Sequence, residues 1–411
     1  MHTAEIEQKE TRITRALAIA ETLQPQSGCW TVPSQSGEGC YIVEPGKNCS
    51  CQDFRKRGPD GLVCKHLIAV QLVIEKQQET EIKPDGTVST TQTVRMTYSQ
   101  QWSAYDAAQT HEAERFEDLL CRLCAGIAQP VQSTGRPQLP LSDVVFALAL
   151  KTYSTVSGRR ATSYIRGAQS RGLIEHTPHY SSAFRRLESE ELTPLLQALI
   201  EESARPLSVV ETKLAIDSTG FATNSYSRWY DYKWGRVRSE QKWIKLHLMT
   251  GTTTNIITAA QATAYESADA PQLPALLERS TQAFNAQEIT GDKAYSSKAN
   301  LRAIEATGAV PYIPFKEGTR PVPVRRDQQD ELWEKMWYYY NFRRDDFLSH
   351  YHVRSNVEST MMMLKSKFGG SVRAKLPVSQ VNETLLKCLC HNLCVLVQSI
   401  YELELEPVFW G

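Results

Sequence analysis

Three cysteines and one histidine lie close together near the amino terminus, in the stretch CSCQDFRKRGPDGLVCKH. Their spacing is Cys49-x-Cys51-x12-Cys64-x-His66. Two close pairs separated by a loop can meet around one ion, and three thiolates with one imidazole suit tetrahedral Zn²⁺. Because the protein would then fill all four positions of the ion, the pattern predicts a structural zinc that folds a small module and leaves no position for catalysis.

The other cysteines and the charge balance limit where such a chain works. It has 411 residues and ten cysteines, and its first segment is charged and amphipathic, unlike a secretion signal. We therefore expect reduced thiols and a cytoplasmic protein. No run of 18 apolar residues is present, so we expect no transmembrane helix. The 46 basic and 46 acidic side chains cancel, so any contact with a polyanion must come from local clusters.

A chain of this length should contain two or three domains. We expect four regions: a zinc-finger module with a helix and a hairpin at 1–82, a connector and helix at 83–140, a helical region at 141–206, and an α/β domain at 207–411 with a short helical insertion at 317–349. Between Arg136 and Arg186 there are eight basic and two acidic residues. This balance favours DNA binding by the helical region, and a bundle with an accidental basic face is the alternative.

From residue 207 onward, apolar runs alternate with helical patterns. The segments SVVETKLAIDSTGFA, QKWIKLHLMTGTTTNIITAAQA, QEITGDKAYSS and AVPYIPFK are typical of strands, so we expect a mixed α/β domain with a buried central sheet. Asp217 and Asp292 each follow an apolar run, beside small residues, where we expect the strand to end. A carboxylate fixed there can bind a metal; the alternative is that each aspartate caps a turn.

The stretch YHVRSNVESTMMMLKSKFGG, residues 351–370, contains one acidic residue, Glu358. It has no proline and ends in a glycine pair, which predicts a helix with a glycine cap. On that helix Tyr351, Arg354, Glu358 and Lys365 would share a stripe about 60° wide. A carboxylate flanked by cations can hold a metal while the cations hold phosphates. A solvated helix face with an ordinary ion pair is the alternative.

Together the two aspartates and Glu358 form an all-oxygen set that suits Mg²⁺ or Mn²⁺ and two-metal phosphoryl transfer. The spacing Tyr351-x2-Arg354-x3-Glu358-x6-Lys365 resembles the Tyr-Arg-Glu-Lys signature of bacterial insertion-sequence transposases with an Asp-Asp-Glu site. The aspartates, in IDST and GDKAYSS, resemble that family's first and second acids in order and setting, and the run WIKLH at 243–247 resembles its second-strand motif.

This resemblance, over residues 135–400, implies a ribonuclease H-like core whose three acids, Asp217, Asp292 and Glu358, bind two Mg²⁺ or Mn²⁺ and catalyse the reaction. The tyrosine, arginine and lysine of the signature would contact the DNA backbone. The implied activity is cutting at the ends of the element and joining of 3′-hydroxyl ends to target DNA, in the prokaryotic cytoplasm, by a dimer or higher oligomer on DNA. Some relatives pass through a DNA hairpin, and the sequence leaves that question open.

The cysteine cluster resembles the SWIM zinc finger, including the preceding hairpin around Trp30 and Tyr41. Basic residues at 55–57 suggest that such a module touches DNA, with a protein partner as the alternative. The later cluster of Cys388, Cys390, His391 and Cys394 is predicted to be core packing, because positions two apart on a helix point to different sides.

A second basic cluster, RWYDYKWGRVRSEQKWIK at 228–245, has six basic and two acidic residues. If Asp217 is catalytic, this hairpin lies beside the site, and Arg236, Arg238 and Lys245 become candidate phosphate contacts. A solvated hairpin is the alternative. Trp333 and Trp337, one helical turn apart, would either stack an unpaired base or pack in the core.

The sequence therefore predicts a DNA transposase with a zinc-finger module, a helical DNA-binding region and a catalytic α/β domain. Two other interpretations remain: a non-catalytic DNA-binding protein derived from a transposase, and a zinc-finger adaptor whose α/β part serves assembly. A transposase should nick DNA in the presence of a metal ion, whereas the non-catalytic DNA-binding protein should not. The zinc-finger adaptor should keep its function when Asp292 is replaced, whereas a transposase should lose it.

Overall fold

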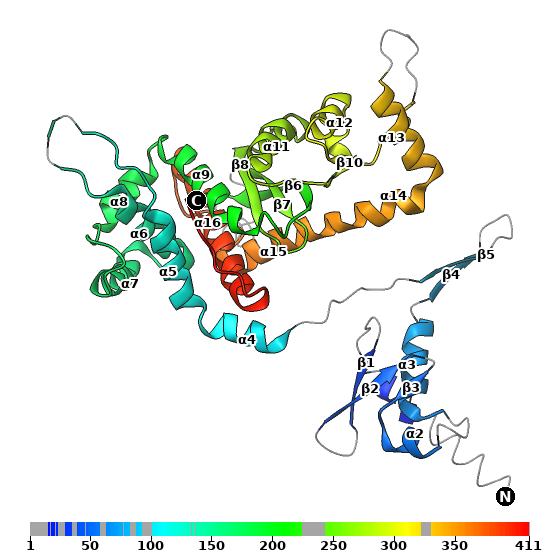
Figure 1. Cartoon of the computed structure of the whole chain (residues 1–411). Coiled ribbons are helices and arrows are strands. Elements are labelled where there is room, and N and C mark those ends of the chain that lie inside the picture. The colour runs from blue at the N-terminus through cyan, green and yellow to red at the C-terminus, as the bar shows by residue number, and fades with distance from the viewer. Residues whose placement is uncertain are drawn as a thin grey trace, which may run out of the picture. The chain divides into compact units, whose positions relative to one another are not determined.

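The structure is a computed structural model, and it divides into two compact units, residues 1–100 and 101–411. Figure 1 shows the chain coloured from its amino to its carboxyl terminus. The structure describes residues 15–16, 18–20, 22–23, 29–34, 39–45, 47–57, 63–76, 78–82, 88–92, 101–132, 134–135, 137–223, 243–321 and 330–410. The domain boundaries expected at 82, 140 and 206 stay predictions.

In the first unit, a three-stranded antiparallel sheet packs against a helix. Its elements are β1 (Trp30–Pro33), β2 (Cys40–Glu44), β3 (Asn48–Cys49), α2 (Gln52–Arg57) and α3 (Lys65–Lys76). The expected hairpin is present, because β1 pairs with β2 and places Trp30 opposite Val43. Trp30 and Val32 are buried while Thr31 is exposed, which is the alternation of a strand with one face on a core. This small core also contains Val70 of α3.

Strand pairing extends into the segment expected to be a polar connector. β4 (Gln78–Ile82) pairs antiparallel with β5 (Val88–Gln92). The main chain supplies these pairs, so a polar composition does not prevent them, and the threonines of VSTTQ favour a strand.

The second unit begins with helices that pack around the carboxyl-terminal helix. They are α4 (Trp102–Thr110), α5 (Glu112–Cys124), α6 (Leu141–Tyr153), α7 (Gly158–Ser170), α8 (Tyr180–Leu187), α9 (Leu192–Ala204) and the 3₁₀ turn η2 (Arg205–Leu207). The last helix, α16 (Pro377–Glu402), contacts α4, α5, α6, α8 and α9 and also strand β8. The helical region is therefore part of one compact unit with the α/β sheet.

A five-stranded mixed sheet forms the centre of the second unit. Its strands are β6 (Lys213–Ala222), β7 (Trp243–Gly251), β8 (Ile257–Ala264), β9 (Glu288–Gly291) and β10 (Val310–Tyr312), in the order β10-β9-β6-β7-β8. β6, β7 and β8 are antiparallel neighbours, whereas β9 is parallel to β6 and β10 is parallel to β9. The expected mixed α/β class is confirmed.

Helices cover both faces of this sheet, with α11 and α12 on one side and α15 and α16 on the other (Figure 1). The remaining elements are η3 (Ala270–Gln272), α11 (Leu273–Thr281), η4 (Lys293–Tyr295), α12 (Lys298–Glu305), α13 (Glu331–Phe342), α14 (Arg344–Tyr351), η6 (His352–Arg354) and α15 (Ser355–Phe368). The insertion before α15 is helical, as expected.

The single helix expected over 351–368 is divided. α14 ends at Tyr351, a 3₁₀ turn follows, and α15 begins at Ser355. The tighter turn is closed by the N–H of Ser355, which donates to the carbonyls of His352 and Val353. The expected glycine cap is present, because Gly369 has φ +79° and ends α15.

Within the described residues, α16 is the one helix long and apolar enough to cross a membrane, but 78% of its apolar window is buried in the second unit. Buried polar side chains tie it to its neighbours: Asn392 donates to the carbonyls of Ile200 and Ile257 and accepts from the Ile257 N–H. These contacts are those of a core helix, in which buried amides find partners. Cys388, Cys390 and His391 are buried on this helix, in agreement with core packing.

Candidate active site and metal centre

Asp217 and Asp292 emerge at the same edge of the sheet. β6 and β9 run parallel, and their pairing ends at Ile216 opposite Gly291. The next residue on each strand is therefore one of the two aspartates, and parallel strands place their carboxyl ends together. Asp217 does not end its strand as expected, because β6 continues to Ala222 by pairing with β7. What ends there is the pairing with β9.

The carboxylate of Asp292 caps a turn, and its role as a metal ligand stays a prediction. Its Oδ1 accepts from the N–H of Ala294 at 2.7 Å and caps the short turn η4. The cap fixes the carboxylate at the end of β9. The preceding Gly291 permits close packing, since a Cβ there would lie 2.9 Å from the Ile216 side chain.

Arg354 connects the strand acid to the helix acid. Its guanidinium donates to Asp217 Oδ2 at 2.8 Å and to Glu358 Oε1 at 2.6 Å. It also lies 5.8 Å from the ring centre of Tyr351. The Asp217 and Arg354 side chains are about one-fifth exposed, and Glu358 is 58% exposed. The tyrosine, arginine and glutamate expected to act together are thus in contact at the end of the β6–β9 pairing.

The charge at this site is not fully balanced. Burial raises the pKa of Asp217, the charges of Asp292 and Glu358 raise it further, and Arg354 together with the Ser218 N–H opposes them. An acid whose pKa is raised by other acids lies where a cation would be stabilised. The three carboxylates offer only oxygen, which fits Mg²⁺ or Mn²⁺. They do not converge tightly in the described part of the chain, and Arg354 lies between two of them.

The helix that carries Glu358 is fixed to the sheet at both ends. Near its start, Asn356 donates to the carbonyl of Thr252 at 2.6 Å. Near its end, the Lys365 ammonium donates to Thr219 Oγ1 at 2.5 Å. Buried Lys387 of α16 donates to the carbonyls of Gly369 and Ser371, which follow α15. Lys365, expected to contact DNA, therefore lies over β6 with its ammonium near the site.

A polar cluster that sequence reasoning missed lies on the other face of β6 and β7. Lys245 donates to Asp269 at 2.8 Å, and His247 Nδ1 lies 3.3 Å from the same carboxylate. Burial raises the pKa of Tyr295, and the charges of Asp269, Asp217 and Asp292 raise it further. Lys245, a candidate phosphate contact, is thus paired with Asp269. Lys245 and His247 are two residues apart on one strand, so the sequence already indicated that their side chains share a face.

His247 makes the stability of the second unit dependent on pH. Burial lowers the pKa of His247 to about 4. The unfolded chain, with a histidine pKa near 6.5, binds the proton more readily, so the free energy of unfolding falls as pH falls through this range. At about 1.4 kcal/mol per pH unit, the interval corresponds to at most about 3.5 kcal/mol of unfolding free energy. Urea unfolding between about pH 7 and 4.5 should show a flatter profile for His247→Gln; equal profiles would contradict this assignment.

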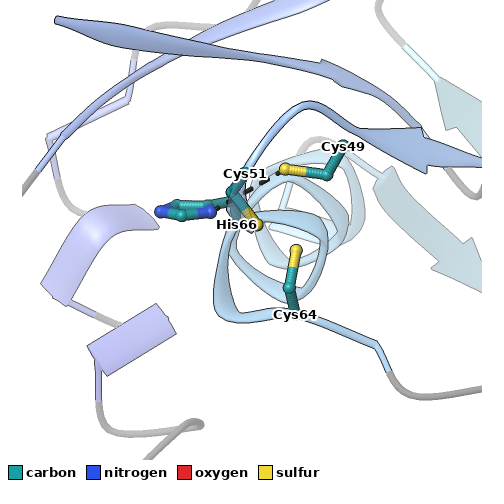
Figure 2. A group of neighbouring side chains, drawn as sticks. All are labelled: Cys49, Cys51, Cys64 and His66. Atoms are coloured by element: carbon teal, nitrogen blue, oxygen red, sulfur yellow. Dashed lines mark hydrogen bonds between the residues drawn. The ribbon is translucent and has the colours of Figure 1, made fainter. Parts of the chain in front are cut away.

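In the first unit, Cys49, Cys51, Cys64 and His66 come together, as the spacing predicts (Figure 2). Their ligand atoms all lie within 4.8 Å of one another, and all four residues are buried. Cys49 ends β3, Cys51 precedes α2, and the other two lie at the start of α3. This is the only such group among the described residues.

The thiols of the cluster interact with one another. Hydrogen bonding with Cys64 and burial raise the pKa of Cys49, while hydrogen bonding with Cys49 lowers the pKa of Cys64 to about 4. His66 directs Nδ1 toward Cys49 Sγ at 3.8 Å. Thiolate sulfur and imidazole nitrogen in one closed group fit tetrahedral Zn²⁺.

Two family models match the parts of the chain that contain these residues. Residues 210–393 match the family model of the transposase DDE domain, and residues 40–74 match that of the SWIM zinc finger. The chain carries a transposase DDE domain and a SWIM zinc finger. Both family resemblances drawn from the sequence are thereby confirmed.

Among solved structures, a piggyBac transposase synaptic complex with hairpin DNA is similar, with a TM-score of 0.32 and 9% identity over 75% of this chain and 77% of that chain. A similarity this low carries no argument about fold or function. No curated protein matches the chain.

Within the DDE domain, the structure describes some of the remaining candidate residues and not others. Arg236 and Arg238 lie outside the described residues. Trp333 and Trp337 on α13 are partly buried against the core, and their indole N–H groups donate to the carbonyls of Arg320 and Thr319. These contacts favour the core interpretation over base stacking.

Proposed function

We propose that the protein is a DNA transposase of an insertion sequence, which binds the ends of its element, cuts phosphodiester bonds and joins 3′-hydroxyl ends to target DNA. One observation carries the proposal: Asp217 and Asp292 emerge at one edge of the sheet, and Arg354 joins Asp217 to Glu358, all within the stretch that matches the transposase DDE domain. The match supports a transposase, and the geometry supports an active one.

The catalytic domain is proposed to have a ribonuclease H-like core. The strand order, with three antiparallel strands followed by two parallel ones, supports this assignment. So does the position of the acids, two beside paired strand ends and one on a helix that packs across β6.

Asp217, Asp292 and Glu358 are proposed to hold two Mg²⁺ or Mn²⁺, which when bound activate the attacking water or 3′-hydroxyl and stabilise the leaving 3′-oxygen. Arg354 neutralises two of these acids, and its planar guanidinium suits a DNA phosphate equally well. We therefore expect it to exchange carboxylate partners for phosphate when DNA binds. Tyr351 beside it is proposed to orient that phosphate.

Beyond the catalytic acids, Lys365, Lys245, Arg236 and Arg238 stay proposed DNA contacts. The SWIM module is proposed to hold one structural Zn²⁺ through its four ligands. The partner is double-stranded DNA, at element ends and at the target. Two ends must be cut, so a dimer or higher oligomer on DNA is proposed, in the prokaryotic cytoplasm.

The test uses the full-length protein and the DNA that flanks its gene. We expect nicks at the element ends with Mg²⁺ or Mn²⁺, and none with EDTA, because the acids alone supply no electrophile. In cells, sequencing should find junctions with the wild type and none with Asp292→Asn. Binding of the flanking DNA without nicking by either ion would instead favour the non-catalytic DNA-binding protein.

A further inference from the structure

A cavity of about 250 Å³ lies in the helical part of the second unit, away from the three acids. Its walls come from α6, α8 and the segment before and at the start of α16, and include Lys151, Phe184, Arg373, Lys375 and Glu383. Arg373 and Lys375 are exposed, and Lys151 is partly buried. The cavity therefore has one cation in its wall and two at its mouth, and two acids, Glu188 and Glu383, also line it.

The Lys151 ammonium is available for a ligand. In the described part of the chain it has no hydrogen bond or ion pair, and its one recorded contact is with the Phe184 ring, whose centre is 6.0 Å away. The nearby acid, Glu383, uses both oxygens to accept from the N–H groups of Arg373 and Ala374. That carboxylate shapes the loop at the cavity mouth, and the hydrogen bonds satisfy it there.

Burial and the neighbouring charges act on the Lys151 ammonium in opposite directions. Burial lowers the pKa of Lys151, and the positive charge of Arg373 lowers it further, against the opposing charge of Glu383. Two cations held near each other over an apolar wall repel, and a bound anion relieves that repulsion.

Aromatic and basic residues continue from the cavity onto the surface of α7 and α8. Phe184 contacts Tyr180, and the Arg159 guanidinium lies 5.4 Å from the Tyr180 ring centre. Gly158 permits this packing, because a Cβ there would lie 2.5 Å from Phe184. The guanidinium of Arg159 thus lies beside a pair of aromatic rings next to the cavity, an arrangement that suits a nucleic-acid backbone.

We propose that the cavity between Lys151 and Arg373 binds a phosphate group, and that the DNA backbone supplies it. This rests on the proposed function, and it gives the helical region a defined contact with DNA. The phosphate lies in the cavity between the two cations, and the flanking duplex follows the Arg159–Tyr180 surface.

The test compares Lys151→Met, which keeps the apolar stem on Phe184, with Lys151→Arg, which restores the charge. Arg122→Gln is the matched control, since it removes one charge on α5 that is already paired with Glu406. We measure DNA binding by fluorescence anisotropy over a range of salt concentrations. Lys151→Met should weaken binding roughly tenfold and reduce the salt slope by about one, while Lys151→Arg and Arg122→Gln stay near wild type. Equal thermal unfolding curves show that the variants are folded.

A second measurement separates DNA from a free anion. Inorganic phosphate should raise the melting temperature of the wild type and not that of Lys151→Met. Loss of both effects in Lys151→Met supports the proposal. Loss of the phosphate effect with unchanged DNA affinity assigns the cavity to a free phosphate and overturns the DNA contact. No change in either measurement overturns the site. A phosphate effect in a wild type that binds no DNA contradicts the proposed function and leaves an anion site.

Discussion

Glu358→Gln is expected to bind DNA with near wild-type affinity and to cut it at least about a thousandfold more slowly. The amide has the shape of the carboxylate and keeps an oxygen for Arg354, so the ion-pair position on α15 remains occupied. It loses the negative charge that a divalent cation requires of its ligand. The substitution therefore lowers the cutting rate and leaves folding unchanged. The cutting rate is measured with purified protein, Mn²⁺ and the flanking DNA.

Two further variants sharpen this expectation. Glu305→Gln removes an exposed carboxylate from α12, outside the site, and should cut at the wild-type rate. Asp292→Asn combined with Glu358→Gln should be no slower than either change alone, because residues that act as one unit are not additive. Wild-type cutting by Glu358→Gln would show that the glutamate has no part in the reaction.

The strands of the catalytic domain were accessible from the sequence because their signals are local. A run such as KLAID becomes a strand wherever its apolar residues can be buried on both faces. The change to small polar residues at Asp217 predicts the end of the strand. It marks instead the loss of one neighbour, since β7 continues to pair with β6 while β9 has ended. A sequence pattern indicates which residues are buried. It does not distinguish the end of a strand from a point where the strand loses one of its two neighbouring strands.

The contacts that were missed are those between distant segments. Asp269 lies before a short 3₁₀ turn, in a loop with no regular pattern, and the fold brings it to Lys245 across 24 residues. Arg354 similarly meets Asp217 across 137 residues. Helix geometry indicated that Arg354 and Glu358 share a face, and they do so despite the 3₁₀ turn before α15. The packing of the helix against the sheet determines which residues that face contacts, and the sequence pattern does not show this.

The clustering of the four proposed zinc ligands could be predicted from the sequence, because these residues are close together along the chain. All four lie within eighteen residues, so loop length and ligand chemistry suffice to place them together. The three acids proposed to be catalytic are spread over 142 residues, from 217 to 358, and only the completed sheet brings them near. A metal centre of the first kind helps to fold its module, whereas one of the second kind requires a folded domain beforehand.

Cys64→Ser is accordingly expected to lose the bound zinc and to unfold the first unit, while the second unit stays folded. The apolar core of the first unit is small, with Trp30, Val32 and Val43 packed against α3. A core of this size supplies only about 3–5 kcal/mol, whereas structural zinc contributes on the order of 10 kcal/mol. Zinc content by atomic emission should fall from one ion per chain to none, and amide exchange should become rapid within residues 1–100 alone.

Cys40→Ser is the matched control for this prediction, because it removes an exposed thiol from β2 of the same unit and leaves the four ligands intact. It should keep one zinc and slow amide exchange. If Cys64→Ser keeps its protected amides after losing the metal, the small core folds without help, and the cluster then serves a purpose other than stability. If both units lose protection together, the second unit depends on the first, which the separate cores do not suggest.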